Sequence, residues 1–479
     1  MSRPHPEQPP PAAPEVTSPM QGGYAAITLT LVAFVSMVAF EAMSVTVVMT
    51  PVAAALGAPQ LYGLAFSLMF TAQMLGTIVA GPWIRRRGPV DSLFVGQALF
   101  AAGSLLAGAA TSYSMLLLGR LLAGLGAGLA VVAEYVIIGA VFPGRLRPKV
   151  FGWTSAAWVL PSIVGPLIAG ALMQWLSWRA VFLVVVPTTA ATMLAFWMQR
   201  HRLPRRPTAA DGAPPSTARA DRQIVRIGCT LAVSAGAFQW GASHLSPPTW
   251  WALALAVGGL VGLTATLPRL VPSGTFTMKV GLPSVIMTRF LLLAAFNGAL
   301  SFVPTLLIAL RGLSVNAAGA ILALTSVGWA AGSIVQGRAR FLGRASWLVT
   351  TGAGCVAVGL LGCALGAWAN LWAWAFIVPV SVVGLGMGLT SAATSVLTLQ
   401  LSPPAEHATA SSALQLSDVL GSAIGISVTG AVYAALVPRD GPAGAGVYVL
   451  MWLMAACVAA LAWPAARRTH ARVPRSATG

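Results

Sequence analysis

Residues 115–142 read MLLLGRLLAGLGAGLAVVAEYVIIGAVF, an apolar run that contains two charged side chains, Arg120 and Glu134. At a rise of about 1.5 Å per residue, a helix of this length crosses the roughly 30 Å hydrocarbon core of a bilayer. The run is continuous and lacks the alternation of a lipid-facing strand, which excludes a β-barrel. It predicts a membrane-spanning helix with two ionisable groups inside it.

The rest of the chain has the same character. Of its 479 residues 57% are hydrophobic and 8% are charged, and the mean hydropathy is +0.81. These values exclude a soluble enzyme, a disordered protein and a DNA-binding domain. The net charge of +18 would suggest a nucleic-acid partner, but the basic residues lie in short clusters between apolar runs. We therefore expect a polytopic membrane protein that binds no nucleic acid.

The apolar runs predict an all-α protein with 14 transmembrane helices. They lie at 25–48, 61–83, 92–111, 115–142, 150–174, 178–199, 224–243, 249–267, 284–310, 317–337, 346–367, 371–399, 406–436 and 446–464. The expected organisation is a six-helix bundle at 25–199, two inserted helices with their connecting loop at 224–283, and a second six-helix bundle at 284–466. Between them, residues 200–223 are rich in Arg, Pro and Ala and predict a loop.

The distribution of Lys and Arg predicts the orientation. With the N-terminus inside, the inner segments hold 22 of these residues and the outer loops hold three. Because positively charged loops stay in the cytoplasm, both the proline-rich tail at 1–24 and the basic tail at 467–479 are expected there. The tail at 1–24 lacks the features of a signal peptide. The charge count does not separate 14 spans from 12, since both numbers are even.

One sequence string occurs twice. GLGAGL at 124–129 returns as GLGMGL at 384–389, and the same offset of 260 pairs Gly165 with Gly425 and Gly170 with Gly430. The offset predicts two pseudo-symmetric parallel six-helix halves, an arrangement typical of transporters with a central site. The alternative is that these glycines only allow helices to pack closely.

Four further strings carry a family resemblance. Loop residues 81–88 read GPWIRRRG, residues 117–126 read LLGRLLAGLG, Gly165 and Pro166 precede Gly170, and WRAVF at 178–182 is followed by Pro187. In this order the chain resembles the major facilitator superfamily, and within it the 14-span drug:proton antiporter branch. Arg85 replaces the usual aspartate of the loop motif. The resemblance implies that Gly165, Pro166 and Gly170 form the antiporter motif.

Three acidic residues lie inside predicted spans, where an ionisable group is costly and indicates function. Counted from the ends of their spans, Glu41 and Arg120 lie at similar depth in the outer half of the membrane. The resemblance places both beside the cavity. We predict that this pair couples transport to protons; the alternative is a static structural pair.

The other two acids are predicted to act at a cytoplasmic gate. Glu134 lies near the inner end of its span, at the depth of Arg85 and Arg86, and the resemblance suggests a latch between them. The alternative for Glu134 is a proton site. Asp418 lies in the inner third of its span. Since the loop motif has Arg85 where an acid is usual, one hypothesis pairs Arg85 with Asp418. A solvated cavity acid is the equal alternative.

The predicted substrate cavity includes Asn297, Gln415 and Trp158, although lipid or packing contact is the simpler reading of the tryptophan. Neither a phosphate-binding loop nor a zinc motif occurs, so no cofactor or metal is expected. The energy must come from an ion gradient or from the substrate's own gradient.

The sequence thus predicts a monomeric, non-enzymatic antiporter in a bacterial plasma membrane that exports small lipophilic compounds in exchange for protons. A lipid or metabolite exporter and a non-transporting scaffold or sensor are the alternatives.

Overall fold

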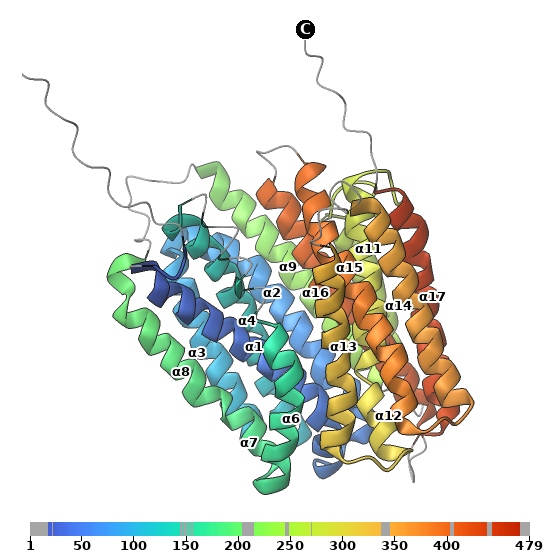
Figure 1. Cartoon of the computed structure of the whole chain (residues 1–479). Coiled ribbons are helices and arrows are strands. Elements are labelled where there is room, and N and C mark those ends of the chain that lie inside the picture. Colours follow the sequence, from blue (N-terminus) through green and yellow to red (C-terminus); the bar gives the residue numbers. More distant parts are fainter. Residues whose placement is uncertain are drawn as a thin grey trace, which may run out of the picture.

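The computed structural model describes residues 18–21, 23–143, 146, 150, 153–154, 157–203, 215–244, 249–269, 271–336, 345–402, 407–437 and 443–469. Within these ranges the chain is helical and contains no strand (Figure 1). The α-helices are α1 (Gly23–Ala55), α2 (Tyr62–Arg87), α3 (Pro89–Gly108), α4 (Tyr113–Val141), α6 (Val159–Trp175), α7 (Trp178–Leu183), α8 (Val185–Met198), α9 (Pro215–Ser243), α10 (Trp250–Thr266), α11 (Leu282–Leu300), α12 (Val303–Ala309), α13 (Val315–Gln336), α14 (Ala345–Trp368), α15 (Ile377–Gln400), α16 (His407–Leu436) and α17 (Ala445–Arg467).

Twelve segments of the described chain are long and apolar enough to cross a membrane. The protein is therefore a multi-pass helical membrane protein, as predicted. Two further helices coincide with predicted spans: α6, whose apolar part Val164–Trp175 is short, and α9, whose first turns are charged. Two predicted spans are interrupted, 178–199 between α7 and α8 and 284–310 between α11 and α12. The count of 14 spans stays a prediction.

The expected loop at 200–223 needs a correction, because α9 begins at Pro215 and includes the last part of that segment. Proline suits the first turn of a helix, where its missing N–H has no partner to lose. The Ala and Arg residues that follow favour helix as well. Residues 204–214 of that loop lie outside the described residues, as do 1–17 and 470–479 of the two tails.

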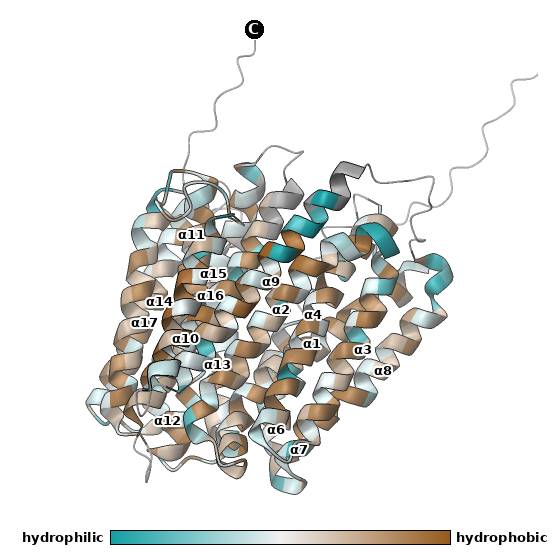
Figure 2. Cartoon of the chain, turned by 180° about the vertical axis from the view of Figure 1, so that it is seen from behind, coloured by the Kyte–Doolittle hydropathy of each residue, from teal (hydrophilic) through white to brown (hydrophobic). Residues whose placement is uncertain are grey.

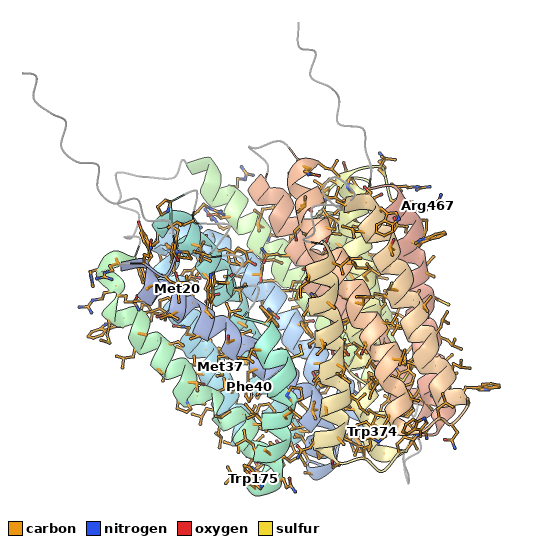
Figure 3. All side chains as sticks on the ribbon, viewed as in Figure 1. Met20, Met37, Phe40, Trp175, Trp374 and Arg467 are labelled. Atoms are coloured by element: carbon orange, nitrogen blue, oxygen red, sulfur yellow. The ribbon has the colours of Figure 1, made fainter. Side chains whose placement is uncertain are left out.

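The two ends of the helical bundle can be told apart by the chain termini. Met20 and Arg467 lie toward one end, which we call the terminal end, and Trp175 and Trp374 lie toward the opposite end, which we call the far end (Figure 3). The helices α2, α9, α11 and α16 run between these ends through the body of the molecule (Figure 1).

The repeated glycine string makes equivalent contacts in both of its copies. A Cβ atom on Gly124 would overlap the carbonyl oxygen of Met69 in α2, and one on Gly384 would overlap that of Thr325 in α13. Because no side chain separates the two backbones, α4 packs directly on α2, and α15 packs directly on α13. Helix α2 thus lies beside the first copy of the glycine string, in α4, as α13 lies beside the second copy, in α15.

A second glycine pair at the same offset also makes equivalent contacts. Gly165 of α6 contacts α1 at Ser44, and its partner Gly425 of α16 contacts α11 at Ala294. Thus α1 and α11 also have matching positions, as α2 and α13 do. The sequence repeat therefore corresponds to a repeat of packing contacts.

Candidate functional site

An ion pair joins α1 to α4 in the interior. The guanidinium Nη1 of Arg120 donates to the carboxylate Oε1 of Glu41, and the two side chains are 2% and 1% exposed. Arg120 also donates from Nε to the carbonyl oxygen of Ala65 in α2, at 3.3 Å. The structure brings together the two residues that were predicted from their depth and from the family resemblance.

The second oxygen of Glu41 has no hydrogen-bond donor among the described residues. A buried ion pair must offset the desolvation of both ions, and it does so best when every lone pair is satisfied. Here one carboxylate oxygen is left without a partner next to a fixed guanidinium. The arrangement is that of a carboxylate that can take a proton on Oε2 while Oε1 keeps its arginine.

The far end of the molecule is closed by contacts between α1–α2 and α11–α12. The hydroxyl of Tyr62 donates to the carbonyl oxygen of Ser301 at 2.5 Å, and the hydroxyls of Thr50 and Thr305 lie 3.1 Å apart. The ring of Phe302 contacts the rings of Tyr62 and of Tyr433 in α16 in tilted geometry, with 5.2 Å between centroids in each pair. Sequence reasoning missed this seal, because residues 62 and 301 are distant in sequence.

The three residues of the predicted antiporter motif lie in α6, against α1 on one side and α13 on the other. The carbonyl oxygen of Gly165 accepts a hydrogen bond from Ser44 at 3.1 Å. Pro166 packs on Gly319, and Gly170 packs so closely on Asn316 that no Cβ atom would fit between them. The motif therefore lies at a contact between helices of the first and the second half, where small residues permit close approach.

Asp418 does not pair with Arg85, so the proposed exchange of charges is wrong for this conformation. Both carboxylate oxygens of Asp418 accept from Arg289 of α11, at 2.7 Å from Nε and 2.9 Å from Nη2. The remaining nitrogen of Arg289 donates to Ser391 and Thr394 of α15. Asp418 is thus part of a bidentate pair within the second half, and its side chain is 25% exposed.

Arg85 and Arg86 pair with an acid that sequence reasoning did not single out. Nη2 of Arg85 donates to Asp221 of α9, and Nε of Arg86 lies 3.9 Å from the other oxygen of Asp221. Asp221 was assigned to a loop, so its place beside α2 could not be foreseen.

The expected latch between Glu134 and the loop arginines is also not formed in the described part of the chain. Glu134 is 3% exposed, and its Oε1 has no hydrogen-bond partner there. It lies seven residues before the end of α4, whereas Arg85 and Arg86 stand half-exposed in the last turn of α2. The depth of Glu134 inside the helix keeps its carboxylate away from both.

The predicted cavity residues are distributed over different helices. Asn297 of α11 donates to the hydroxyl of Ser422 in α16 at 2.9 Å, and it is partly buried. Gln415 is also partly buried, three residues before Asp418 in α16. Trp158, just before α6, is 39% exposed. Their role in substrate binding stays a prediction.

Replacing Arg289 with lysine is expected to destabilise the protein although the charge is kept. The lysine ammonium cannot reproduce the planar fork that holds Asp418 and also reaches Ser391 and Thr394. Loss of one charge-assisted hydrogen bond costs about 2 kcal/mol. A lower melting temperature of the purified protein in detergent would show this. Arg311→Lys is the control, because Arg311 makes an exposed bond to Leu371; equal melting temperatures for both variants would contradict the prediction.

Comparison with known proteins adds independent findings. The family model of the Major Facilitator Superfamily matches residues 29–426. The multidrug efflux pump SdrM of Staphylococcus aureus is 27% identical over 172 residues, which are 36% of this chain and 38% of that protein. The methylenomycin A resistance protein of Bacillus subtilis is 25% identical over 397 residues, 80% of this chain and 81% of that protein. A triacylglyceride transporter of Mycolicibacterium smegmatis is 27% identical over 405 residues, which are 76% of this chain and 67% of that protein. The chain spans about half the length or less of several curated relatives that it matches.

Solved structures share the fold at low sequence identity. A peptide transporter POT in complex with sulfate has a TM-score of 0.66 at 16% identity and covers 95% of this chain and 97% of its own. A D-xylose-proton symporter has a TM-score of 0.62 at 14% identity, and the match covers 91% of this chain and 97% of the symporter. At this identity the likeness concerns the fold alone.

Proposed function

The chain belongs to the Major Facilitator Superfamily, and we propose that it is a proton-coupled exporter of apolar or amphipathic small molecules. It would work by alternating access in a bacterial plasma membrane, with both termini in the cytoplasm. The observation that carries the proposal is the buried pair of Glu41 and Arg120, in which one carboxylate oxygen has no donor among the described residues.

The chemistry of this pair supports proton coupling. A carboxylate surrounded by apolar helices is destabilised when it is charged and is stabilised by a nearby guanidinium. A small change in the distance to Arg120 therefore alters how strongly Glu41 holds a proton. Arg120 is held by Ala65 of α2 as well as by Glu41, so a movement of α1 relative to α2 and α4 changes that distance.

Alternating access is supported by the contacts between the two halves. The repeated glycines make matching contacts in α4 and α15 and in α6 and α16, which favours two pseudo-symmetric bundles with α9 and α10 inserted between them. The seal around Tyr62 and Ser301 closes the far end. With cytoplasmic termini, the described conformation is closed to the outside.

Export of lipophilic compounds is supported by the names of the relatives and by the motif in α6. SdrM is a multidrug efflux pump, and the Bacillus relative confers resistance to methylenomycin A, as their names state. The relative named as a triacylglyceride transporter favours a second candidate, the export of a lipid by the same route. A scaffold or sensor without transport is disfavoured, because the intramembrane Glu41 and Arg120 are retained.

Reconstitution into proteoliposomes tests the proposal. An imposed pH gradient should drive a lipophilic dye or a fluorescent acylglycerol against its concentration gradient, and the better substrate of the two decides between the candidates. Movement of both compounds at the rate of empty liposomes, with a correctly inserted protein, would rule out the proposal.

We further predict 14 spans, with α9 crossing the membrane. Its 29 residues extend about 43 Å, enough for the hydrocarbon core. Single cysteines at Gln223 and His244 should therefore react with an impermeant maleimide from opposite sides of the membrane. Labelling of both positions from one side would exclude a crossing and leave a smaller number of spans.

A further inference from the structure

The helix α9 packs on helices of both halves. Gln239 of α9 donates to the hydroxyl of Thr71 in α2 at 2.7 Å, and Gly228 packs on Ile78 of α2. Toward the second half, α9 shares an apolar cluster with Leu416 and Leu420 of α16. Figure 1 shows α9 reaching the terminal end near the ends of α2 and α16.

The position of α9 matters because α2 and α16 also touch each other. At the far end a Cβ atom on Gly63 of α2 would lie 3.0 Å from the Cα atom of Gly430 in α16. Nearer the terminal end, side chains of α9 lie in one apolar cluster with Met74 of α2 and Leu416 of α16. Protein interiors are close-packed, so α2 and α16 cannot approach further there unless α9 moves.

A polar contact holds the terminal end of α9 to α2. Asp221 is 7% exposed and accepts from Arg85, with Arg86 nearby at 3.9 Å. Figure 2 shows hydrophilic residues gathered in the first turns of α9, above its apolar body. The last turn of α2 has Arg85 where the loop motif usually has an acid, and the carboxylate that pairs with this arginine comes from α9.

We propose that α9 is a conformational brace that favours the state closed at the far end, and that the contact of Asp221 with Arg85 and Arg86 is its clip. To close the terminal end, α2 and α16 must approach each other, α9 must be displaced, and the clip must open. This inference rests on alternating access, and it does not require any particular substrate or coupling ion. It gives the inserted helices a role in setting the balance between the two states.

The expected effect of Asp221→Asn is a shift toward the state that is closed at the terminal end. The amide keeps the size of the side chain and removes its charge. Arg85 is 46% exposed, so water screens the pair and the effect is moderate. We expect the ratio of the two states to change about fivefold, which is readily measured when both are populated.

Distances between spin labels on the two halves measure this ratio. The labels are placed at Arg200, after α8, and at Arg467, at the end of α17, both of which are exposed and belong to different halves. The four native cysteines are first replaced by serine or alanine. Asp221→Asn should increase the population with the shorter distance. The reciprocal pair Arg85→Asp with Asp221→Arg should return the distribution toward that of the unmodified protein.

The control is Asp91→Asn in α3, which removes the same charge near the terminal end but affects a hydrogen bond from Trp83. An unchanged distribution in Asp221→Asn, or an equal shift in Asp91→Asn, would overturn the proposal. If Asp221→Asn does not give monodisperse protein, the double variant Arg85→Gln with Arg86→Gln opens the clip from the other side and must give the same shift. The measurement needs neither substrate nor gradient, so its failure is distinct from a failure of proton-coupled export.

Discussion

Proton-driven accumulation is expected to disappear when Glu41 is replaced by glutamine. The amide oxygen can still accept the hydrogen bond from Arg120, so the helices keep their contact. The amide cannot bind and release a proton in the cycle. A gradient of one pH unit stores about 1.4 kcal/mol per proton and supports about a tenfold accumulation of a neutral substrate exchanged one for one. For Glu41→Gln we expect equal substrate concentrations on the two sides of the membrane.

Two assays on the same proteoliposomes separate loss of coupling from loss of protein. The variant should keep exchange of labelled for unlabelled substrate without a gradient, because that reaction needs the conformational change and no net proton movement. Asp91→Asn is the matched control, because it removes an acid outside the pair and should keep the full accumulation. If Glu41→Gln still accumulates substrate like the unmodified protein, Glu41 does not carry the proton.

A methyl group at Gly124 is expected to destabilise the protein severely. A Cβ atom there would overlap the main-chain oxygen of Met69, and a main-chain atom cannot rotate away as a flexible side chain can. Overpacking of a close-packed interior typically costs about 1–3 kcal/mol, and occasionally more. Because the obstacle here is the backbone of α2, we expect about 3 kcal/mol or more and little monodisperse protein.

The same helix supplies the control for this substitution. Gly139 of α4 has open space around its Cβ position, so Gly139→Ala should keep the yield and melting temperature of the unmodified protein or improve them. Gly384→Ala should reproduce the loss seen for Gly124→Ala, because its Cβ atom would overlap Thr325 of α13. Equal thermal stability of Gly124→Ala and Gly139→Ala in detergent would contradict the close packing of α4 on α2.

The ion pair of Glu41 and Arg120 shows what can be predicted by counting residues from the ends of a span. Glu41 and Arg120 were predicted to lie at one depth from the number of residues to the ends of their spans, and they form a direct contact. The same counting misled for Arg85 and Asp418, which share an end of the bundle but have other partners. Depth along the membrane normal is a local property of one helix, whereas the direction around the helix depends on its neighbours.

The sequence by itself determined that the protein is a helical membrane protein of this family, because long apolar runs and their glycine strings are local and can be read along the chain. It also predicted which ionisable groups lie within the apolar helices. Only the tertiary structure decided the partners: Arg289 with Asp418, Asp221 with Arg85, and Tyr62 with Ser301. Each of these pairs joins residues more than 100 positions apart. The packing of whole helices brings them together, and no local pattern in the sequence encodes that packing.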